Sequence, residues 1–531
     1  MSEIATGYFS FMARNFPVMC ASDEFYFFPR SSESVEYSGC LDQLGREEIE
    51  QSFLEVKGFL KDLENLKGED LNLEEKIDLD LLRQSILTFL REYGQVRIWQ
   101  KDPCLYLKIA MIGQDQALST EKWEEKVLNR LTKIPDLLHQ GELNLTDVSN
   151  LHREAALEML AGSIDFLAAT KDEFNYKSEL ETANLRAIES LEKFRDFLRS
   201  VSTTDVFAQG EEILAQILAE NYGSNRSLEE VHEIATREYQ GVLNQIENLS
   251  LTIDKHKNWQ EVLADYRVEV DDPVNLIELY RREVSSLRNF LEKNDIVPLP
   301  SFQEIKVAGS PIYLEPLRSS ASYSSPPTNT IGPQCFFYIK MSEMDLVQSD
   351  DNPHKEYLFM TAHETYPGHH LLDMSRKAQP NPVRRQIESP LFYEGWACYG
   401  EQLIDETGYS EDPYQKLICR KRQLWRSLRA LLDIGLHTGK LGLAEARERL
   451  AGLGLSRQRA YQQVRNYALT YGYQLCYLLG RYEIMELRKK FADKISLKEF
   501  HNLLLKGGQI PFKWIEKRID KNIKCQSPKF K

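Results

Sequence analysis

Three histidines and a glutamate lie within one eight-residue stretch, HETYPGHH, which runs from His363 to His370. Two imidazoles that converge on one ion, with a carboxylate beside one of them, are what a zinc hydrolase needs. In the common form of the motif, H-E-x-x-H, the histidines are one helical turn apart and share a face. Here His363 and His369 are six residues apart, which in an unbroken helix puts them about 120° out of phase. An unbroken helix would therefore not bring both to one ion.

Pro367 and Gly368 stand between the two histidines and predict a bulge in the helix. Proline removes a backbone donor and clashes with the preceding turn, and glycine tolerates unusual dihedral angles. If two residues loop out, His369 takes the place of the second histidine in H-E-x-x-H. We therefore expect His363 and His369 to be metal ligands.

Asp373 bears on the choice between the two adjacent histidines. It follows His369 by four residues, or one helical turn, so its carboxylate can accept the second ring proton of that imidazole and fix its tautomer. His370 has no such partner in Asp373. We favour His369 as the second ligand and keep His370 as the alternative.

A third ligand is needed, because two histidines leave a tetrahedral zinc ion one protein ligand short. Glu394, in the segment EGWACYGE, is the favoured residue, on a separate helix that returns towards the motif. Glu388 is the alternative, disfavoured because a proline follows two residues later, where a helix ends. Glu401 lies two turns beyond Glu394 on the same face, where it supports a ligand or joins an ion pair.

Glu364 remains for acid–base chemistry, since it follows a ligand directly and projects at a different angle. It would take a proton from water at the metal and pass it to the leaving amine. The developing oxyanion needs a donor besides the metal. Tyr473, Tyr477 and His501 are the candidates, each of which has an ordinary packing role as its alternative.

Composition bounds the class of protein. The chain has 531 residues, so we expect an N-terminal helical region, 1–295, and a catalytic region, 296–531, in one bilobed unit. A net charge of −15 argues against nucleic acid or an anionic membrane as partner. Scattered cysteines, and the lack of a signal-peptide layout or a long apolar stretch, favour a cytoplasmic protein. The oligomeric state is not set by the sequence.

Apolar residues recur at helical spacing through most of the chain, so we expect a mainly α fold. Ser227 with Glu230 predicts a capping box that opens one helix. Between residues 297 and 340, prolines interrupt β-prone runs such as 305–307 and 335–339, which predict a small sheet near residues 300–341. An edge of that sheet could hold an extended peptide, or the sheet could only brace the helices.

Two segments, HETYPGHHL and EGWACYGEQL, resemble the signatures of a mainly bacterial family, domain of unknown function number 885, regarded as zincin-like metallopeptidases. ASYSSPP, residues 321–327, and FHNLLLKGGQIP, residues 500–511, are similar to other pieces of that family. The resemblance implies a helical zincin-like fold with a deep cleft and, as in gluzincins, a downstream glutamate as third ligand. It implies no substrate. Tyr473 and Asn502 depart from the residues that many relatives carry, which leaves the substrate contacts open.

These observations predict a zinc-dependent peptidase that holds one Zn²⁺ per chain and cleaves short peptides, as an exopeptidase or a small oligopeptidase. One alternative is a zinc amidohydrolase that acts on a non-peptide amide, because the same chemistry serves any carbonyl. The other is a non-catalytic helical binding scaffold with structural histidines. That scaffold would leave Glu364 without a role.

Overall fold

The computed structural model describes the chain except for a few short segments; the described residues are 1–66, 71–174, 177–268, 272–300, 304–325, 335–346 and 352–526. The chain is mainly helical with small sheets, which confirms the expected mainly α class. Pro326 and Pro327 of the ASYSSPP segment lie outside the described residues. Within the described part, no helix is long and apolar enough to cross a membrane.

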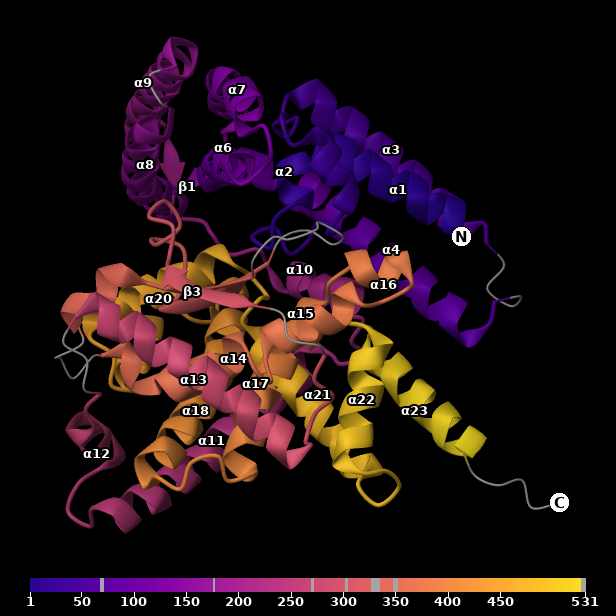
Figure 1. Ribbon diagram of the computed structural model, residues 1–531, viewed down its shortest axis with the longest axis vertical. Coiled ribbons are helices and arrows are strands. Elements are labelled where there is room, and N and C mark those ends of the chain that lie inside the picture. The colour runs from indigo at the N-terminus through magenta and orange to yellow at the C-terminus, as the bar shows by residue number, and fades with distance from the viewer. Residues whose placement is uncertain are drawn as a thin grey trace.

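The helices of residues 2–200 form the upper layer of the molecule, coloured indigo to purple in Figure 1. Their apolar faces meet in a core that continues into the C-terminal helices. Their bounds are α1 Ser2–Asn15, α2 Pro17–Cys20, α3 Arg46–Glu64, α4 Leu73–Leu90, α5 Ile98–Lys101, α6 Pro103–Leu118, α7 Trp123–Asn144, α8 Asn150–Thr170 and α9 Ser178–Ser200.

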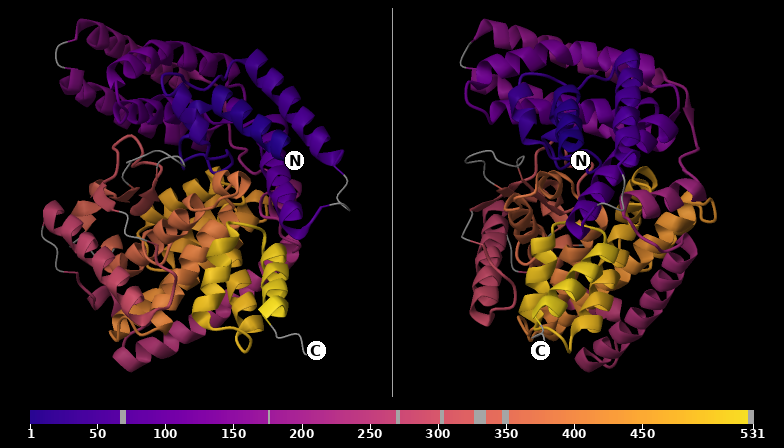
Figure 2. Two further views of the ribbon diagram at one scale, coloured as in Figure 1. Left: turned by 45° about the vertical axis from the view of Figure 1, so that its right-hand side comes forward. Right: turned by 90° about the vertical axis from the view of Figure 1, so that its right-hand side faces the viewer.

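The next helices leave this layer and pack against the C-terminal half of the chain, as both views of Figure 2 show. They are α10 Glu211–Gln216, α11 Leu228–Ile253, α12 Trp259–Asp265 and α13 Pro273–Asn294. The capping box predicted for Ser227 and Glu230 is confirmed at the start of α11. The division of the chain at residue 295 stays a prediction.

The C-terminal helices form the lower layer, coloured orange to yellow in Figures 1 and 2. The long α18 lies along α11, and α17 lies between α14 and α21. The bounds are α14 Tyr357–Glu364, α15 His369–Lys377, α16 Pro382–Gln386, α17 Pro390–Glu406, α18 Pro413–His437, α19 Leu443–Ala451, α20 Arg457–Leu469, α21 Leu475–Phe491, α22 Leu497–Gly507 and α23 Phe512–Gln526.

A three-stranded sheet precedes α14, at the place where the sequence predicts one. Its order is β3 (Ile305–Gly309), β5 (Cys335–Ile339) and β4 (Ala321–Ser324), with β4 antiparallel to the central β5. The strand β4 is therefore an edge strand, and it contacts α14. Two further residue pairs, β1 (Val148–Ser149) and β2 (Thr203–Thr204), form a short parallel ladder.

Two glycines let α17 and α21 touch backbone to backbone. A Cβ on Gly480 would lie 2.0 Å from the carbonyl oxygen of Leu391, and one on Gly395 would lie 2.4 Å from the backbone of Gly480. Any side chain at either position would push the two helices apart, because real Cβ contacts are never this short. This crossing fixes the position of α17, which carries Glu394.

We expect Gly480→Ala to lower the free energy of unfolding by at least about 1–3 kcal/mol, the usual cost of overpacking, because backbone atoms would have to move. Gly58→Ala is the matched control. Gly58 is exposed inside α3, with no atom near the added Cβ, so alanine should stabilise the chain by up to about 1 kcal/mol. Urea unfolding midpoints of the two variants measure both effects. Equal midpoints for Gly480→Ala and wild type would contradict the close crossing.

Candidate metal centre

The helix that carries the HETYPGHH motif is interrupted between His363 and His369, the two candidate ligands. The helix α14 ends at Glu364 and α15 begins at His369, so the motif spans two helices rather than one bulged helix as expected. Two backbone hydrogen bonds cross the break, from Gly368 N–H to Ala362 O (2.9 Å) and from Leu371 N–H to Thr365 O (3.3 Å). Each spans six residues where an α-helix spans four. Two residues are therefore extra, as the two-residue insertion requires.

The break between α14 and α15 is stabilised by close packing at Gly368 and by contacts from α17. A Cβ on Gly368 would lie 1.8 Å from the carbonyl oxygen of His363, so only glycine fits there. The indole N–H of Trp396, on α17, donates to the carbonyl oxygen of Pro367 (2.7 Å). Gly400, one turn along α17, leaves room for the ring of Pro367. The EGWACYGE segment thus packs on the interruption that it follows in sequence.

Three buried side chains converge beside this break: His363, His369 and Glu394, whose ligand atoms all lie within 4.8 Å of one another. Oε2 of Glu394 lies 3.3 Å from Nε2 of His363 and 3.5 Å from Nε2 of His369. Two ligand atoms held about 2.0–2.2 Å from a tetrahedral zinc ion are about 3.3–3.6 Å apart. The spacing of these atoms fits one tetrahedral ion.

The carboxylate oxygen at the centre of this group has no hydrogen-bond partner among the described residues. Oε2 of Glu394 is buried, and the Nε2 atoms of His363 and His369 lie 3.3 and 3.5 Å from it without forming a hydrogen bond. Burial alone would raise the pKa of Glu394, but the two adjacent imidazoles outweigh burial and hold it well below its usual range. A buried, ionised oxygen without a donor is costly unless a cation satisfies it. The residues present therefore fit a metal ion, which they could hold through two nitrogens and one oxygen.

Neighbouring rings hold two of the candidate ligands in place. The hydroxyl of Tyr473 donates to Oε1 of Glu394 (2.6 Å), which leaves Oε2 facing the imidazoles. Tyr393 stacks on His369 with ring centres 3.8 Å apart. Such outer contacts orient metal ligands. Tyr393 was missed by the sequence analysis, although it stands directly before Glu394.

Asp373 does not serve His369, so that expectation is wrong. Its carboxylate accepts from Arg376 (3.0 Å to Nε) and from the hydroxyl of Tyr323 (3.1 Å), and Nδ1 of His369 has no hydrogen-bond partner among the described residues. A guanidinium three residues along the same helix outcompetes a neutral imidazole. His370 contacts Tyr323 (3.3 Å) and lies outside the three-residue group.

Glu401 lies on the far side of His363. Its Oε1 is 2.7 Å from Nδ1 of that ring, a close polar contact, and its carboxylate forms ion pairs with Arg422 and Arg426 of α18. Glu401 therefore both contacts a candidate ligand and joins ion pairs, the two roles expected for it as alternatives. A second grouping, His363 with Cys398 and Glu401, shares the other ring nitrogen of the same histidine. We disfavour an ion there, because two guanidinium groups already neutralise Glu401.

Glu364 ends α14 and lines the pocket without joining the metal group. The backbone N–H of Tyr323, on the edge strand β4, donates to Oε2 of Glu364 (2.8 Å). Burial raises the pKa of this carboxyl above its usual value. A raised pKa suits a group that must take up and then release a proton near neutral pH.

The remaining sequence candidates separate into pocket and core. Tyr477 lines the pocket, with its ring centre 6.4 Å from that of His363. Glu388 also lines the pocket, but it pairs with Arg30 and Arg376 and is outside the metal group. The expectation that His501 donates to an oxyanion is wrong. The residue is fully buried, does not line the pocket, and hydrogen-bonds Tyr399 (2.7 Å) and a backbone carbonyl. Its role is structural.

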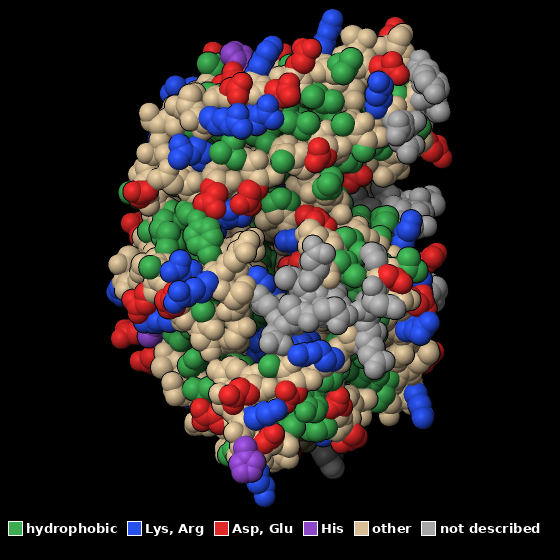
Figure 3. Space-filling model, turned by 90° about the vertical axis from the view of Figure 1, so that its left-hand side faces the viewer, with side chains coloured by type: hydrophobic (Ala, Val, Ile, Leu, Met, Phe, Trp, Pro, Cys, Tyr) green, Lys and Arg blue, Asp and Glu red, His purple; other side chains and the backbone are tan. Residues whose placement is uncertain are grey.

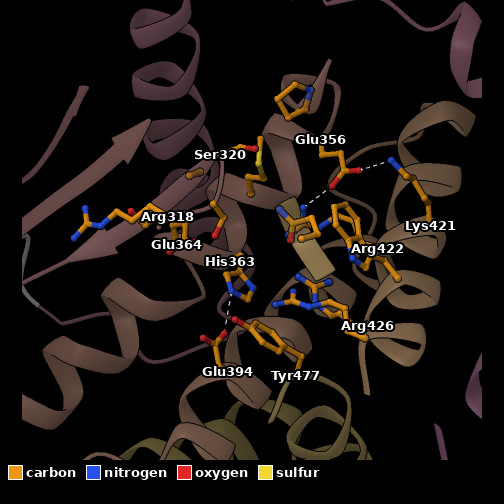
Figure 4. A pocket seen from close by; sticks show the side chains of 18 of the residues that line it. Arg318, Ser320, Glu356, His363, Glu364, Glu394, Lys421, Arg422, Arg426 and Tyr477 are labelled. Atoms are coloured by element: carbon orange, nitrogen blue, oxygen red, sulfur yellow. Dashed lines mark hydrogen bonds and ion pairs between the residues drawn. The ribbon is translucent and has the colours of Figure 1, made fainter. Parts of the chain in front are cut away.

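The pocket over these residues has a volume of about 690 Å³ and opens on the face drawn in Figure 3, which is hollowed between the upper and lower layers, with Lys and Arg side chains in the hollow. Figure 4 shows His363, Glu364 and Glu394 on one side and the basic residues of α18 on the other. This basic wall was not predicted from the sequence. Its signal was the helical spacing of Arg422, Arg426 and Arg429.

A mainly helical chain whose described residues bring two imidazoles and a carboxylate together in a pocket defines the class: a helical protein with a candidate metal centre. Residues 32–519 match the model of the family described as "Bacterial protein of unknown function (DUF885)", so the chain belongs to that family, as the resemblance indicated. No curated protein matches the chain.

Two solved structures share the fold. A candidate lipoprotein from Colwellia psychrerythraea is 18% identical with a TM-score of 0.81, and the alignment covers 99% of each chain. A candidate lipoprotein of unknown function from Shewanella oneidensis is 19% identical with a TM-score of 0.73, covering 91% of this chain and 94% of that one. At this identity the likeness shows the fold alone.

We expect Tyr473→Phe to weaken metal affinity about 10–100-fold, the usual effect of removing a group that orients a ligand. Competition with a chelator measures the affinity. Tyr461→Phe is the matched control, because it removes a tyrosine–glutamate hydrogen bond of similar length, to Glu154 (2.7 Å), outside the pocket. An unchanged metal affinity in Tyr473→Phe would show that this hydroxyl does not position Glu394.

Proposed function

We propose that the protein is a zinc-dependent peptidase in which His363, His369 and Glu394 hold one Zn²⁺. The observation that carries the proposal is the position of the orphaned Oε2 of Glu394, at 3.3 and 3.5 Å from the two Nε2 atoms. These separations match the edges of a zinc tetrahedron. A zinc ion bound there would supply Lewis acidity, which lowers the pKa of a water molecule and polarises a carbonyl.

Glu364 is proposed as the general base. Its carboxylate reaches the pocket beside the metal group, and the Tyr323 N–H fixes one of its oxygens. It accepts a proton from the attacking water and delivers it to the leaving nitrogen. Tyr477 is the better candidate for the oxyanion donor, since the Tyr473 hydroxyl already donates to Glu394. His501 takes no part.

The edge strand β4 favours a peptide over a non-peptide amide. The Tyr323 N–H points away from β5 and into the site, and the alternation of an antiparallel strand turns the N–H and C=O of Ala321 the same way. Residues 319–323 all line the pocket. An extended peptide could pair with this edge by backbone hydrogen bonds. A compact amide would leave the edge unused.

A binding scaffold with structural histidines is the weaker alternative. It would have to bury an ionised carboxylate oxygen that receives no hydrogen bond, which is unfavourable. It also gives no reason for Glu364 to face the pocket. The proposed partners are therefore short peptides, and a cytoplasmic location stays a prediction.

Substitutions of Glu364 and Glu394 should affect zinc binding and peptide hydrolysis differently. We expect about one zinc per chain in wild type and in Glu364→Gln, with hydrolysis of a peptide mixture reduced about 10²–10⁴-fold in the variant, because the general base is lost. Glu394→Gln should lose most of its zinc, because a neutral amide is a poor ligand. Metal analysis and mass spectrometry of the products measure the two effects.

Glu388→Gln is the control, since its carboxylate lines the same pocket outside the metal group. It should keep its zinc. Loss of zinc in Glu388→Gln but not in Glu394→Gln would move the third ligand to Glu388. Full activity of Glu364→Gln would refute the mechanism, and cleavage of non-peptide amides alone would favour the amidohydrolase.

A further inference from the structure

The basic wall of the pocket contains arginines in two different electrostatic states. Arg422 and Arg426 both form ion pairs with Glu401, and Arg422 also pairs with Glu356 (2.7 Å). Arg429 lies one turn further along α18 and also lines the pocket. No carboxylate among the described residues forms an ion pair with Arg429. Arg429 therefore has no direct ion-pair partner within the part of the chain that the structure describes.

Neutral groups hold the Arg429 guanidinium in place. Oε1 of Gln474 accepts from its Nε (2.8 Å) and from its Nη2 (2.5 Å), and the ring of Tyr477 lies under it, 4.0 Å from the guanidinium carbon. Gln474 is itself fixed by Asp433, whose carboxylate binds the backbone N–H groups of Gln474 and Gly472. The Asp433 carboxylate thus holds the backbone that carries Gln474, and it forms no ion pair with the Arg429 guanidinium.

A guanidinium held in this way is suited to bind a carboxylate. Arginine has five N–H donors, and Gln474 uses two of them on one edge of the plane. Donors on Nη1 and Nη2 remain, which form the fork that carboxylates accept with two parallel hydrogen bonds. Because Arg429 is already ordered, little side-chain entropy is lost when an anion binds.

Arg429 is also close to the metal group. The His363 and Tyr477 ring centres are 6.4 Å apart and the Arg429 guanidinium carbon is 4.0 Å from the Tyr477 centre, so that carbon is at most 10.4 Å from the His363 ring centre. An extended peptide advances about 3.3–3.6 Å per residue. A carboxylate bound to Arg429 therefore places the chain end one or two residues beyond the bond that lies at the metal group.

We propose that Arg429 binds the free C-terminal carboxylate of a peptide, so that the protein removes one or two residues from the carboxyl end of its substrates. This inference rests on the proposed peptidase function. In the reaction the C–N bond breaks, the hydroxyl of water joins the carbonyl carbon, and the remaining proton goes to the leaving nitrogen. Arg429 holds the departing segment and exchanges no proton.

The test compares peptides that differ only at the carboxyl end. The zinc-loaded full chain is incubated with N-acetylated pentapeptide mixtures, either as free acids or as C-terminal amides, and the products are followed by mass spectrometry. We expect free acids to be cleaved 10- to 100-fold faster, one or two residues from the end. In Arg429→Gln this preference should fall to near one, and Arg429→Lys should keep part of it.

Two results would overturn the inference: equal cleavage of acids and amides by wild type, or a preference that survives in Arg429→Gln. Arg447→Gln, at a partly exposed position of α19 outside the pocket, is the control and should keep the full preference. Zinc content and melting temperature of Arg429→Gln show whether the variant is folded. If it is not, Arg429→Lys alone decides, and a full preference in that variant refutes the bidentate contact.

A binding measurement separates this inference from the peptidase proposal. Calorimetry on Glu364→Gln compares N-acetyl-tetraalanine as free acid and as amide, and needs no turnover. We expect the acid to bind 10- to 100-fold more tightly, and equal or absent binding counts against the carboxylate site. Selective binding without hydrolysis by wild type would refute the peptidase and keep the site. Hydrolysis without selectivity would do the reverse.

Discussion

The candidate metal centre depends on how α17 packs against its two neighbours. On one side Trp396 and Gly400 lie against the break at Pro367, so the two histidine-bearing helices keep a fixed relation to α17. On the other side, Gly395 and Gly480 set α17 and α21 in backbone contact. Glu394 directly precedes Gly395 on this helix. The relative position of all three ligand atoms thus follows from close packing around one helix.

Most of the buried charged side chains named around the site form ion pairs. Glu401 contacts His363 on one side and two guanidinium groups on the other, so buried ion pairs join α17 and α18 behind the metal group. Burying charge is costly unless partners are present, which explains why these arginines and carboxylates occur together. Arg429 departs from that pattern, since its partners are an amide and aromatic rings.

Local chemistry in the sequence was sufficient for several features. Pro367 and Gly368 predicted the two-residue insertion, and the capping pair at Ser227 predicted the start of α11. The role given to Asp373 failed because spacing along one helix identifies neighbours but not competitors, here Arg376 and the distant Tyr323. For His501 the structure bears out the packing role that the sequence analysis kept as the alternative. The edge strand β4 has only one residue of high strand propensity, Tyr323, so propensity did not predict it.

The hydrogen bond from β4 to Glu364 determines how the site responds to substitution at position 323. Its donor is a main-chain N–H, so replacing the side chain at 323 leaves it intact unless proline is introduced. A survey by alanine substitution would therefore overlook the contact that orients the Glu364 carboxylate. Because the same strand edge lines the pocket, a peptide that paired with it as proposed would also stiffen the backbone that holds the carboxylate. Peptide binding and the orientation of the Glu364 carboxylate would then both depend on the position of β4.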